Sequence, residues 1–271
     1  MDPKTLADEI AAAYRERRAI PTLSSRDSAF GLSDAYAVEA ELVRMRRSAG
    51  RRTVGRKVGF ANKAMWRALQ LDTLVWAYMY DDTVRYAERG SAALSVAPMF
   101  SPKIEPEIVF KLKRSVDPAA LEPAAVLDAV EWLALGFEII DCVFPDWKFQ
   151  PADFVASYGL HAALVVGEPL RVEPATIASL ADALPRFTVQ LRKNGDLVEQ
   201  GSGKNSLRSP ALCLGELGAA IARRSGAETL AAGELISSGT LTTSRPIAAG
   251  EQWSAIVDGL DLAPLALDVR A

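Results

Sequence analysis

The stretch KIEPEIVF, residues 103 to 110, places two carboxylates two positions apart in a run that is otherwise largely apolar. Successive side chains on an extended strand point to opposite faces, so Glu105 and Glu107 share one face and leave the other apolar. Like charges held this close and partly out of water raise at least one pKa unless positive charge lies between them. A divalent cation would supply that charge. The alternative is an edge strand with a wet outer face, which Pro106 permits because proline inside sheets occurs at edges or bulges.

Length and composition describe an ordinary globular chain. It has 271 residues, of which 49% are hydrophobic, which suits one large domain or one domain with a small appendage. The formal net charge is −3, which gives no general attraction for nucleic acid or an anionic membrane. The N-terminus lacks the apolar segment of a signal peptide, and no apolar run is long enough for a membrane span. We therefore expect a cytoplasmic protein with neither nucleic-acid nor membrane partners.

The elements expected from the pattern divide the chain into two parts. Residues 1–52 should form a helical segment, with helices over 4–18 and from an N-cap at Ser33 to Gly50. Residues 53–271 should form a mixed, strand-rich domain. There we expect strands at 56–60 and 104–114, helices at 62–71, at about 123–135 and from Ser209 to Gly226, and a hairpin at Asn194-Gly195.

A third acid, Glu138, lies in LALGFEIIDCVF, a run that otherwise reads as a buried strand. A lone buried carboxylate is costly, so it should be protonated, paired or bound to metal. Three carboxylates without histidine or cysteine form an oxygen-only ligand set, which suits Mg²⁺ or Mn²⁺ rather than zinc. Salt bridges between these acids and nearby arginines are the alternative. The spacing alone favours neither the metal site nor the salt bridges.

Other polar residues interrupt apolar surroundings. Lys57 could be a gatekeeper on an edge strand, and Asp82 could belong to a turn. The segment GSGKNS lacks the residues that a phosphate-binding Walker loop requires. His161 is the only histidine, and no G-x-S-x-G motif supplies a nucleophile for it, so SYGLHAALVVG reads as a strand in which His161 packs or lines a pocket. Cys142 and Cys213 fit no metal or redox spacing.

Five segments, in order from about residue 32 to residue 257, together resemble a known family. They are LSDAYAVEAELVRMRRSAGRRTVGRKVGF, SPKIEPEIVF, GFEIIDCVFPDWKFQPADFVA, LRKNGDLVEQGSG and ISSGTLTTSRPIAAGEQW. The series resembles the 2-keto-4-pentenoate hydratase and 4-oxalocrotonate decarboxylase branch of the fumarylacetoacetate hydrolase superfamily. The resemblance implies an α+β fold, a mixed β-roll with an N-terminal helical segment, and assembly into homo-oligomers.

The resemblance also implies roles for individual residues. Glu105, Glu107 and Glu138 would hold Mg²⁺ or Mn²⁺, and the catalytic residues would be Lys57 and Asp82. Substrate contacts are expected at Phe60, Trp76, Tyr158, His161 and Thr240. The chain departs from the family after K-V-G, where it has Phe60, Ala61 and Asn62, and at LVWA (74–77), SYGL (157–160) and GLD (259–261). The metal set is intact, whereas the segments that contact substrate are altered.

We therefore expect a metal-dependent lyase that adds water to a 2-hydroxydienoate, a small 2-oxo acid in its enol form. Decarboxylation of a 2-oxo diacid, hydrolysis of an acylpyruvate C–C bond, and ligand binding without catalysis are the alternatives. A diacid needs a group that binds its second carboxylate, whereas LVWA and SYGL supply mostly apolar and aromatic side chains. Hydration is favoured unless Arg56, Arg67 or Arg245 folds into the pocket.

Overall fold

The N-terminal fifty residues form three helices, of which the sequence pattern predicts the two longer ones. In the computed structural model, which describes residues 1–120 and 122–271, these are α1 (Pro3–Glu16), α2 (Leu23–Arg26) and α3 (Leu32–Ser48). Asp2 caps α1 by accepting from the Thr5 amide at 2.9 Å. The N-cap of α3 is Gly31 and not Ser33, because Asp34 reaches back to the Gly31 amide. Gly50 follows α3 with φ of +79°, as expected of a glycine that ends a helix.

The larger sheet has nine strands, and β5 and β6 lie in its middle. Its order is β2-β1-β11-β5-β6-β7-β3, with β12 also paired to β5 and β8 to β6. The edge-strand interpretation of KIEPEIVF is therefore wrong, since β5 has neighbours on both sides. The strands are β1 (Thr53–Gly59), β2 (Val75–Tyr80), β3 (Val84–Tyr86), β5 (Lys103–Leu112), β6 (Val130–Ile140), β7 (His161–Val166), β8 (Leu170–Arg171), β11 (Leu235–Ser237) and β12 (Arg245–Pro246).

Pro106 is tolerated inside this sheet because its neighbour is interrupted there. On one side of β5, β11 pairs with residues 109–111 and β12 with residues 103–104, and an irregular segment separates these two short strands. The Pro106 carbonyl accepts from the Leu241 amide of that segment. The proline nitrogen thus faces a gap in the ladder, where the missing N–H breaks no strand pairing.

The second sheet has five strands in the order β10-β9-β13-β14-β4. Asn194 and Gly195 join β9 to β10 with φ of +50° and +91°, the conformation that a two-residue I′ turn requires. The predicted hairpin is confirmed. The strands are β4 (Ser91–Ser95), β9 (Thr188–Lys193), β10 (Asp196–Ser202), β13 (Gln252–Asp258) and β14 (Leu265–Arg270).

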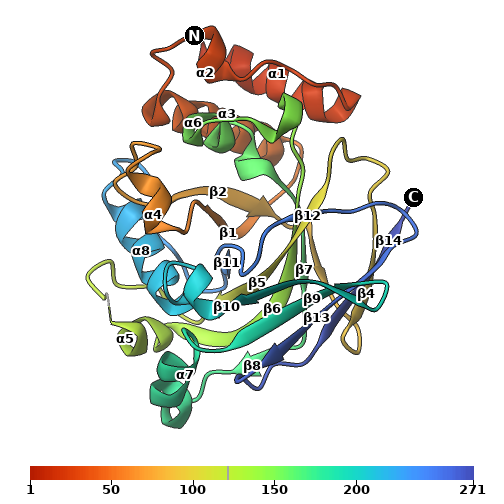
Figure 1. The fold of residues 1–271 in the computed structure, drawn as a ribbon. Coiled ribbons are helices and arrows are strands. Elements are labelled where there is room, and N and C mark those ends of the chain that lie inside the picture. Colours follow the sequence, from red (N-terminus) through yellow and green to blue (C-terminus); the bar gives the residue numbers. More distant parts are fainter. Residues whose placement is uncertain (121) are drawn as a thin grey trace.

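Helices cover the sheets at two places. Figure 1 shows α1, α2, α3 and α6 (Pro151–Val155) together at one end of the molecule and α8 (Pro210–Ala222) along the side. The remaining helices are α4 (Lys63–Trp66), α5 (Pro123–Leu127) and α7 (Ile177–Ala183), with 3₁₀ turns η1 (Pro145–Trp147), η2 (Tyr158–Leu160), η3 (Pro174–Thr176) and η4 (Gly203–Asn205). The helix expected at about 123–135 ends at Leu127, because residues from Val130 onward pair with β5.

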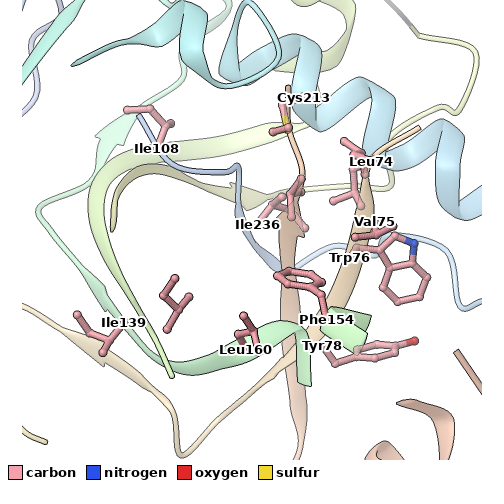
Figure 2. Close-up of a cluster of buried hydrophobic side chains, with 14 of the residues drawn as sticks. Leu74, Val75, Trp76, Tyr78, Ile108, Ile139, Phe154, Leu160, Cys213 and Ile236 are labelled. Carbon is pink, nitrogen blue, oxygen red and sulfur yellow. The ribbon is translucent and has the colours of Figure 1, made fainter. Parts of the chain in front are cut away.

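One contiguous core joins the helical end to the sheets. It includes Leu6, Ile10 and Leu42 from the N-terminal helices together with Ile108 and Ile139 from the central strands. Figure 2 shows part of it, with Phe154 of α6 and Cys213 of α8 among side chains from the sheet. The chain thus has the mixed α+β roll that was expected. The division into 1–52 and 53–271 stays a prediction.

A membrane-spanning helix was not expected. In residues 1–120 and 122–271, none of the helices combines the length and the apolar character that a membrane crossing needs.

Candidate metal centre and its cavity

Three carboxylates meet where β5 and β6 pair. Glu105 lies directly opposite Glu138 across the two strands, and Glu107 follows two residues along β5 on the same face. One oxygen from each can be chosen so that all lie within 4.8 Å of one another. Glu107 and Glu138 are fully buried, and Glu105 is partly exposed. Two residues predicted from strand alternation and a third from a different strand therefore form one cluster.

Glu107 is held on one oxygen and free on the other. Its Oε2 accepts from the Ser237 hydroxyl at 2.6 Å and from the Gly239 amide at 2.8 Å. Gly239 has φ of +90°, and a Cβ there would lie 2.8 Å from Ala61 Cβ, so glycine is required for this approach. The other oxygen, Oε1, is buried and has no hydrogen-bond partner in the described part of the chain. A buried carboxylate oxygen without a partner is costly, which makes it a natural ligand atom.

Glu138 carries two positive or proton-donating neighbours. Lys57 Nζ of β1 lies 2.9 Å from its Oε2, and His161 Nδ1 of β7 lies 2.9 Å from its Oε1. Because an ionised carboxylate only accepts hydrogen bonds, we assign the Nδ1 proton of His161 to this contact. His161 Nε2 lies 2.9 Å from the Thr83 hydroxyl, so both ring nitrogens are engaged.

Burial and mutual repulsion separate the pKa values of the three acids. Burial raises the pKa of Glu105 to about 7, although Lys57 opposes the shift. Burial, reinforced by Glu138 and Glu105, raises the pKa of Glu107 well above its usual range. Burial also disfavours ionised Glu138, but Lys57 and His161 outweigh it and lower that pKa. Without a further cation the cluster therefore favours one ionised carboxylate over three.

Burial disfavours the charged form of Lys57 as well, yet Glu138, Glu105 and Glu107 together raise its pKa above the usual value. Lys57 is thus an ammonium group whose charge depends on the carboxylates around it.

The residues fit a hard divalent cation. The donors are carboxylate oxygens only, one of them has no partner, and two of the acids resist ionisation without added positive charge. The arginine salt bridges considered as an alternative are absent among the described residues, in which the charged partners of the cluster are Lys57 and His161.

A cavity of about 450 Å³ opens from the cluster. Lys57 and Glu105 line one part, and Phe60, Met65, Trp147, Phe149 and Phe154 supply apolar and aromatic surface elsewhere. The segment 239–244, together with Asn62 and Asn205, supplies polar groups. Such a cavity is large enough for a small organic acid.

No arginine is among the residues that line this cavity in the described part of the chain. Arg56 is buried elsewhere, where it pairs with Glu234 and donates to Tyr78 Oη. Arg245 pairs with Glu199. The arginine that would have favoured a diacid is therefore not supplied by Arg56, Arg67 or Arg245.

Of the residues expected to contact substrate, Phe60 and Thr240 line the cavity, as does Lys57. Trp76 does not. Its neighbour Ala77 is the residue opposite Lys57, so strand alternation turns Trp76 to the other face, where it packs against Tyr36 and Tyr78. Tyr158 and His161 line a different cavity.

Asp82 lies outside the cluster. It follows β2 in a turn, where its carboxylate pairs with Arg46 and with Arg51. Asp82 does not line the cavity, and the next residue, Thr83, is the one that contacts His161. The expected catalytic role of Asp82 is thus not supported by its position.

Sequence reasoning did not single out Trp147, Phe149 and Phe154, nor Ser237 and Gly239 near Glu107. The aromatic residues come from the segment DWKFQPADF, whose density of rings was the available signal. Ser237 and Gly239 follow β11, and only the pairing of β11 with β5 brings them to Glu107.

Comparisons with known proteins agree with this geometry. Residues 79–265 match the family model described as Fumarylacetoacetate (FAA) hydrolase C-terminal. The 2-hydroxyhexa-2,4-dienoate hydratase of Comamonas testosteroni is 29% identical, over 95% of this chain and 94% of its own. The 2-hydroxypent-2,4-dienoate hydratase of Pseudomonas putida is 30% identical over 77% and 90%. A 4-oxalocrotonate decarboxylase of Pseudomonas putida G7, complexed with magnesium and adipate, shares the fold with a TM-score of 0.87, 24% identity, and coverage of 98% and 97%.

Proposed function

Because the chain belongs to the fumarylacetoacetate hydrolase family, we propose that it is a metal-dependent lyase that adds water to a 2-hydroxydienoate. The observation that carries the proposal is a buried cluster of three carboxylates and a lysine at one part of a cavity. Among the described residues, the rest of its lining includes four aromatic side chains and a methionine but no arginine. The names of the two hydratases reported above support the same reaction.

We assign the metal-binding role to Glu105, Glu107 and Glu138, with Mg²⁺ or Mn²⁺ as the ion. A bound cation of this kind supplies positive charge to an oxyanion on the substrate. The protein holds two of the three carboxylates in place for it: Ser237 and Gly239 fix Glu107, and Lys57 and His161 fix Glu138. Such fixed carboxylates need little reorganisation when an ion binds.

We assign proton transfer to Lys57. Conversion of the dienol to its keto form puts a proton on C5 and releases the proton of the 2-hydroxyl group. Addition of water at C4 then releases a proton from the water and puts one on C3. Two protons are thus gained at carbon and two are released at oxygen. The ammonium form of Lys57 can donate and its amine form can take up protons in turn, so net addition of water leaves Lys57 unchanged. Lys57 is the lysine that both lines the cavity and contacts the cluster.

The aromatic part of the cavity favours a substrate with an apolar tail. Phe60 and Phe154 meet edge to face with ring centroids 5.3 Å apart, and Phe149 stacks on Phe154 at 6.3 Å. Burying an apolar chain against these rings is favourable, whereas a second carboxylate there would lose its hydration without gaining a cation. Of the apolar and aromatic side chains that LVWA and SYGL offer for this purpose, Leu160 lines the cavity, whereas Trp76 and Tyr158 do not.

Decarboxylation of a 2-oxo diacid is the second candidate. The Asn62 side chain caps α4 through its oxygen, and its amide nitrogen makes no hydrogen bond to the described residues, so it can donate to a ligand. Thr243 and Ser244 add hydroxyl groups to the lining. These groups could donate to a second carboxylate. A C–C hydrolase would need a base for water, and His161 already has both nitrogens engaged.

Incubation of the Mn²⁺-loaded protein with 2-hydroxypenta-2,4-dienoate, and separately with 4-oxalocrotonate, tests the assignment. We expect a 4-hydroxy-2-oxo acid from the dienoate and little CO₂ from the diacid. CO₂ release from the diacid without hydration of the dienoate would show that decarboxylation is the reaction. Homo-oligomeric assembly and a cytoplasmic location stay predictions.

A further inference from the structure

A second cavity, of about 520 Å³, is lined by His161 and by residues of α1 and α3. Figure 1 shows these two helices together at one end of the molecule. The lining of this cavity comes from both helices, from the end of β2, from η2 and from β7. Cavities of this size typically hold small organic molecules. It is separate from the first cavity, with which it shares no lining residue.

Three tyrosine rings give the second cavity an aromatic wall. The Tyr158 ring lies edge to face with Tyr14 at 6.0 Å and with Tyr80 at 6.3 Å between centroids. Met45 and Met99 complete the apolar lining with flexible side chains that adapt to the shape of a ligand. A planar, largely apolar molecule suits such a wall.

Two of the three phenol groups are free to bind. Tyr14 donates its hydroxyl to the Asp141 carbonyl at 3.0 Å. The hydroxyls of Tyr80 and Tyr158 make no hydrogen bond within residues 1–120 and 122–271, and neither is among the fully buried side-chain atoms that lack a partner, so both keep some exposed surface. Each hydroxyl can therefore donate a hydrogen bond to a ligand that enters the cavity.

The charges around the cavity favour an anion. Arg46 lies 4.6 Å from the centre of the Tyr80 ring, and its ion-pair partner Asp82 is shared with Arg51, so two arginines meet one carboxylate. Asp141 also lines the cavity, but its oxygens accept from three backbone amides, those of Phe100, Ser101 and Cys142. Among the described residues that line the cavity, Arg15 and Arg46 are basic and Asp141 is acidic, so the lining itself carries one more positive than negative charge.

From this wall, these free hydroxyls and this surplus charge, we propose that the second cavity binds a small planar carboxylic acid. The ring or diene of the acid packs among Tyr14, Tyr80 and Tyr158, and its carboxylate lies toward Arg46 and the phenol groups. This site does not depend on the reaction proposed for the first cavity. It lies against Thr83 and His161, the residues that support Glu138 from behind.

Calorimetric titration with trans-cinnamate tests the proposal, and protein freed of metal by chelation and dialysis removes the competing site. We expect saturable binding of one cinnamate per chain, and binding of the uncharged cinnamyl alcohol at least about fivefold weaker, because the alcohol lacks the charge that Arg46 recognises. Absence of saturable cinnamate binding, or equal affinity for the alcohol, would overturn the proposal.

Matched variants locate the binding. Ala162→Trp fills the second cavity and should weaken cinnamate binding at least about tenfold, whereas Thr243→Trp fills the first and should leave it unchanged. The reverse pattern would assign cinnamate to the first cavity and refute the second site. Should Ala162→Trp fail to fold, the double variant Tyr80→Phe, Tyr158→Phe removes only the two unpartnered hydroxyls. We expect it to bind cinnamate at least about threefold more weakly, and unchanged binding would count against the site.

Discussion

At the scale of single residues, the cluster explains why two glutamates lie so close in KIEPEIVF. Their two-residue spacing puts both on one face of β5, and Glu138 joins them from the facing position on β6. These three were predictable because strand alternation and strand pairing are regular. The catalytic role expected for Asp82 rested on a resemblance of motif, and its side chain instead turns toward Arg46 and Arg51.

Replacing Lys57 by methionine should remove proton transfer without removing the cation site. We expect Lys57→Met to lower kcat by a factor on the order of 10² to 10⁴. Metal affinity should be retained, because the substitution removes only a positively charged neighbour of Glu138 and none of the three carboxylate ligands. Steady-state kinetics and calorimetry on the same preparations provide the measurement. Lys113→Met, an exposed lysine beyond β5, is the control. Near-wild-type turnover in Lys57→Met would remove this residue from the mechanism.

His161 should act as a positioning residue. Loss of its hydrogen bond to Glu138 in His161→Leu should weaken Mn²⁺ binding about 10- to 100-fold, as is typical when the partner of a metal ligand is removed. His161→Gln, which keeps a donor, should recover part of that affinity.

Asp82→Asn serves as the comparison for His161, because Asp82 lies outside both the cluster and its cavity. We expect its Mn²⁺ affinity and kcat to stay within about twofold of wild type. A large loss of turnover in Asp82→Asn would restore Asp82 to the mechanism. Unchanged Mn²⁺ binding in His161→Leu would refute the positioning role.

At the scale of helices and strands, the sequence predicted correctly those elements whose conformation depends on neighbouring residues alone. The Asn194-Gly195 hairpin and the N-terminal helices depend on turn chemistry and helical periodicity, both of which are readable in sequence. The helix expected to about residue 135 failed at Val130, because an alanine- and leucine-rich run was recruited as the strand that pairs with β5. Tertiary pairing outweighed local propensity there.

Glu39 on α3 makes the docking of that helix sensitive to pH. It accepts from the Tyr78 amide, and burial raises its pKa to about 7. Since the unfolded pKa is about 4.3, the folded state binds more protons between these values, so the contribution of Glu39 to stability falls as pH rises from about 4.5 to 7. Glu39→Gln should remove this dependence and increase the free energy of unfolding at pH 8 by on the order of 1 to 3 kcal/mol.

Urea unfolding at pH 5 and pH 8 measures this effect. Glu41→Gln, at a partly exposed position on the same helix, is the control. A Glu39→Gln variant that is equally or less stable than wild type at pH 8 would contradict the assignment of a raised pKa.

At the scale of the whole molecule, the two cavities arise from pairings between distant segments. The first combines β1, β5 and the segment after β11, and the second combines α1, α3, η2 and β7. No local pattern shows which face of LVWA or SYGL meets a ligand, since that depends on how the sheet curls and where the helices dock. The sequence therefore allowed the fold class and the carboxylate cluster to be predicted, but not that Trp76 and Tyr158 lie away from the cavity beside that cluster.

The central claim is that three carboxylates from β5 and β6 hold one divalent cation. Calorimetric titration of Mn²⁺ into wild type and into Glu105→Gln, Glu107→Gln and Glu138→Gln tests it most directly, with Glu131→Gln, an exposed position on β6, as control. We predict one ion per chain for wild type and for the control, and affinity at least about tenfold weaker in each of the three variants. Equal Mn²⁺ affinity in all five proteins would contradict the account.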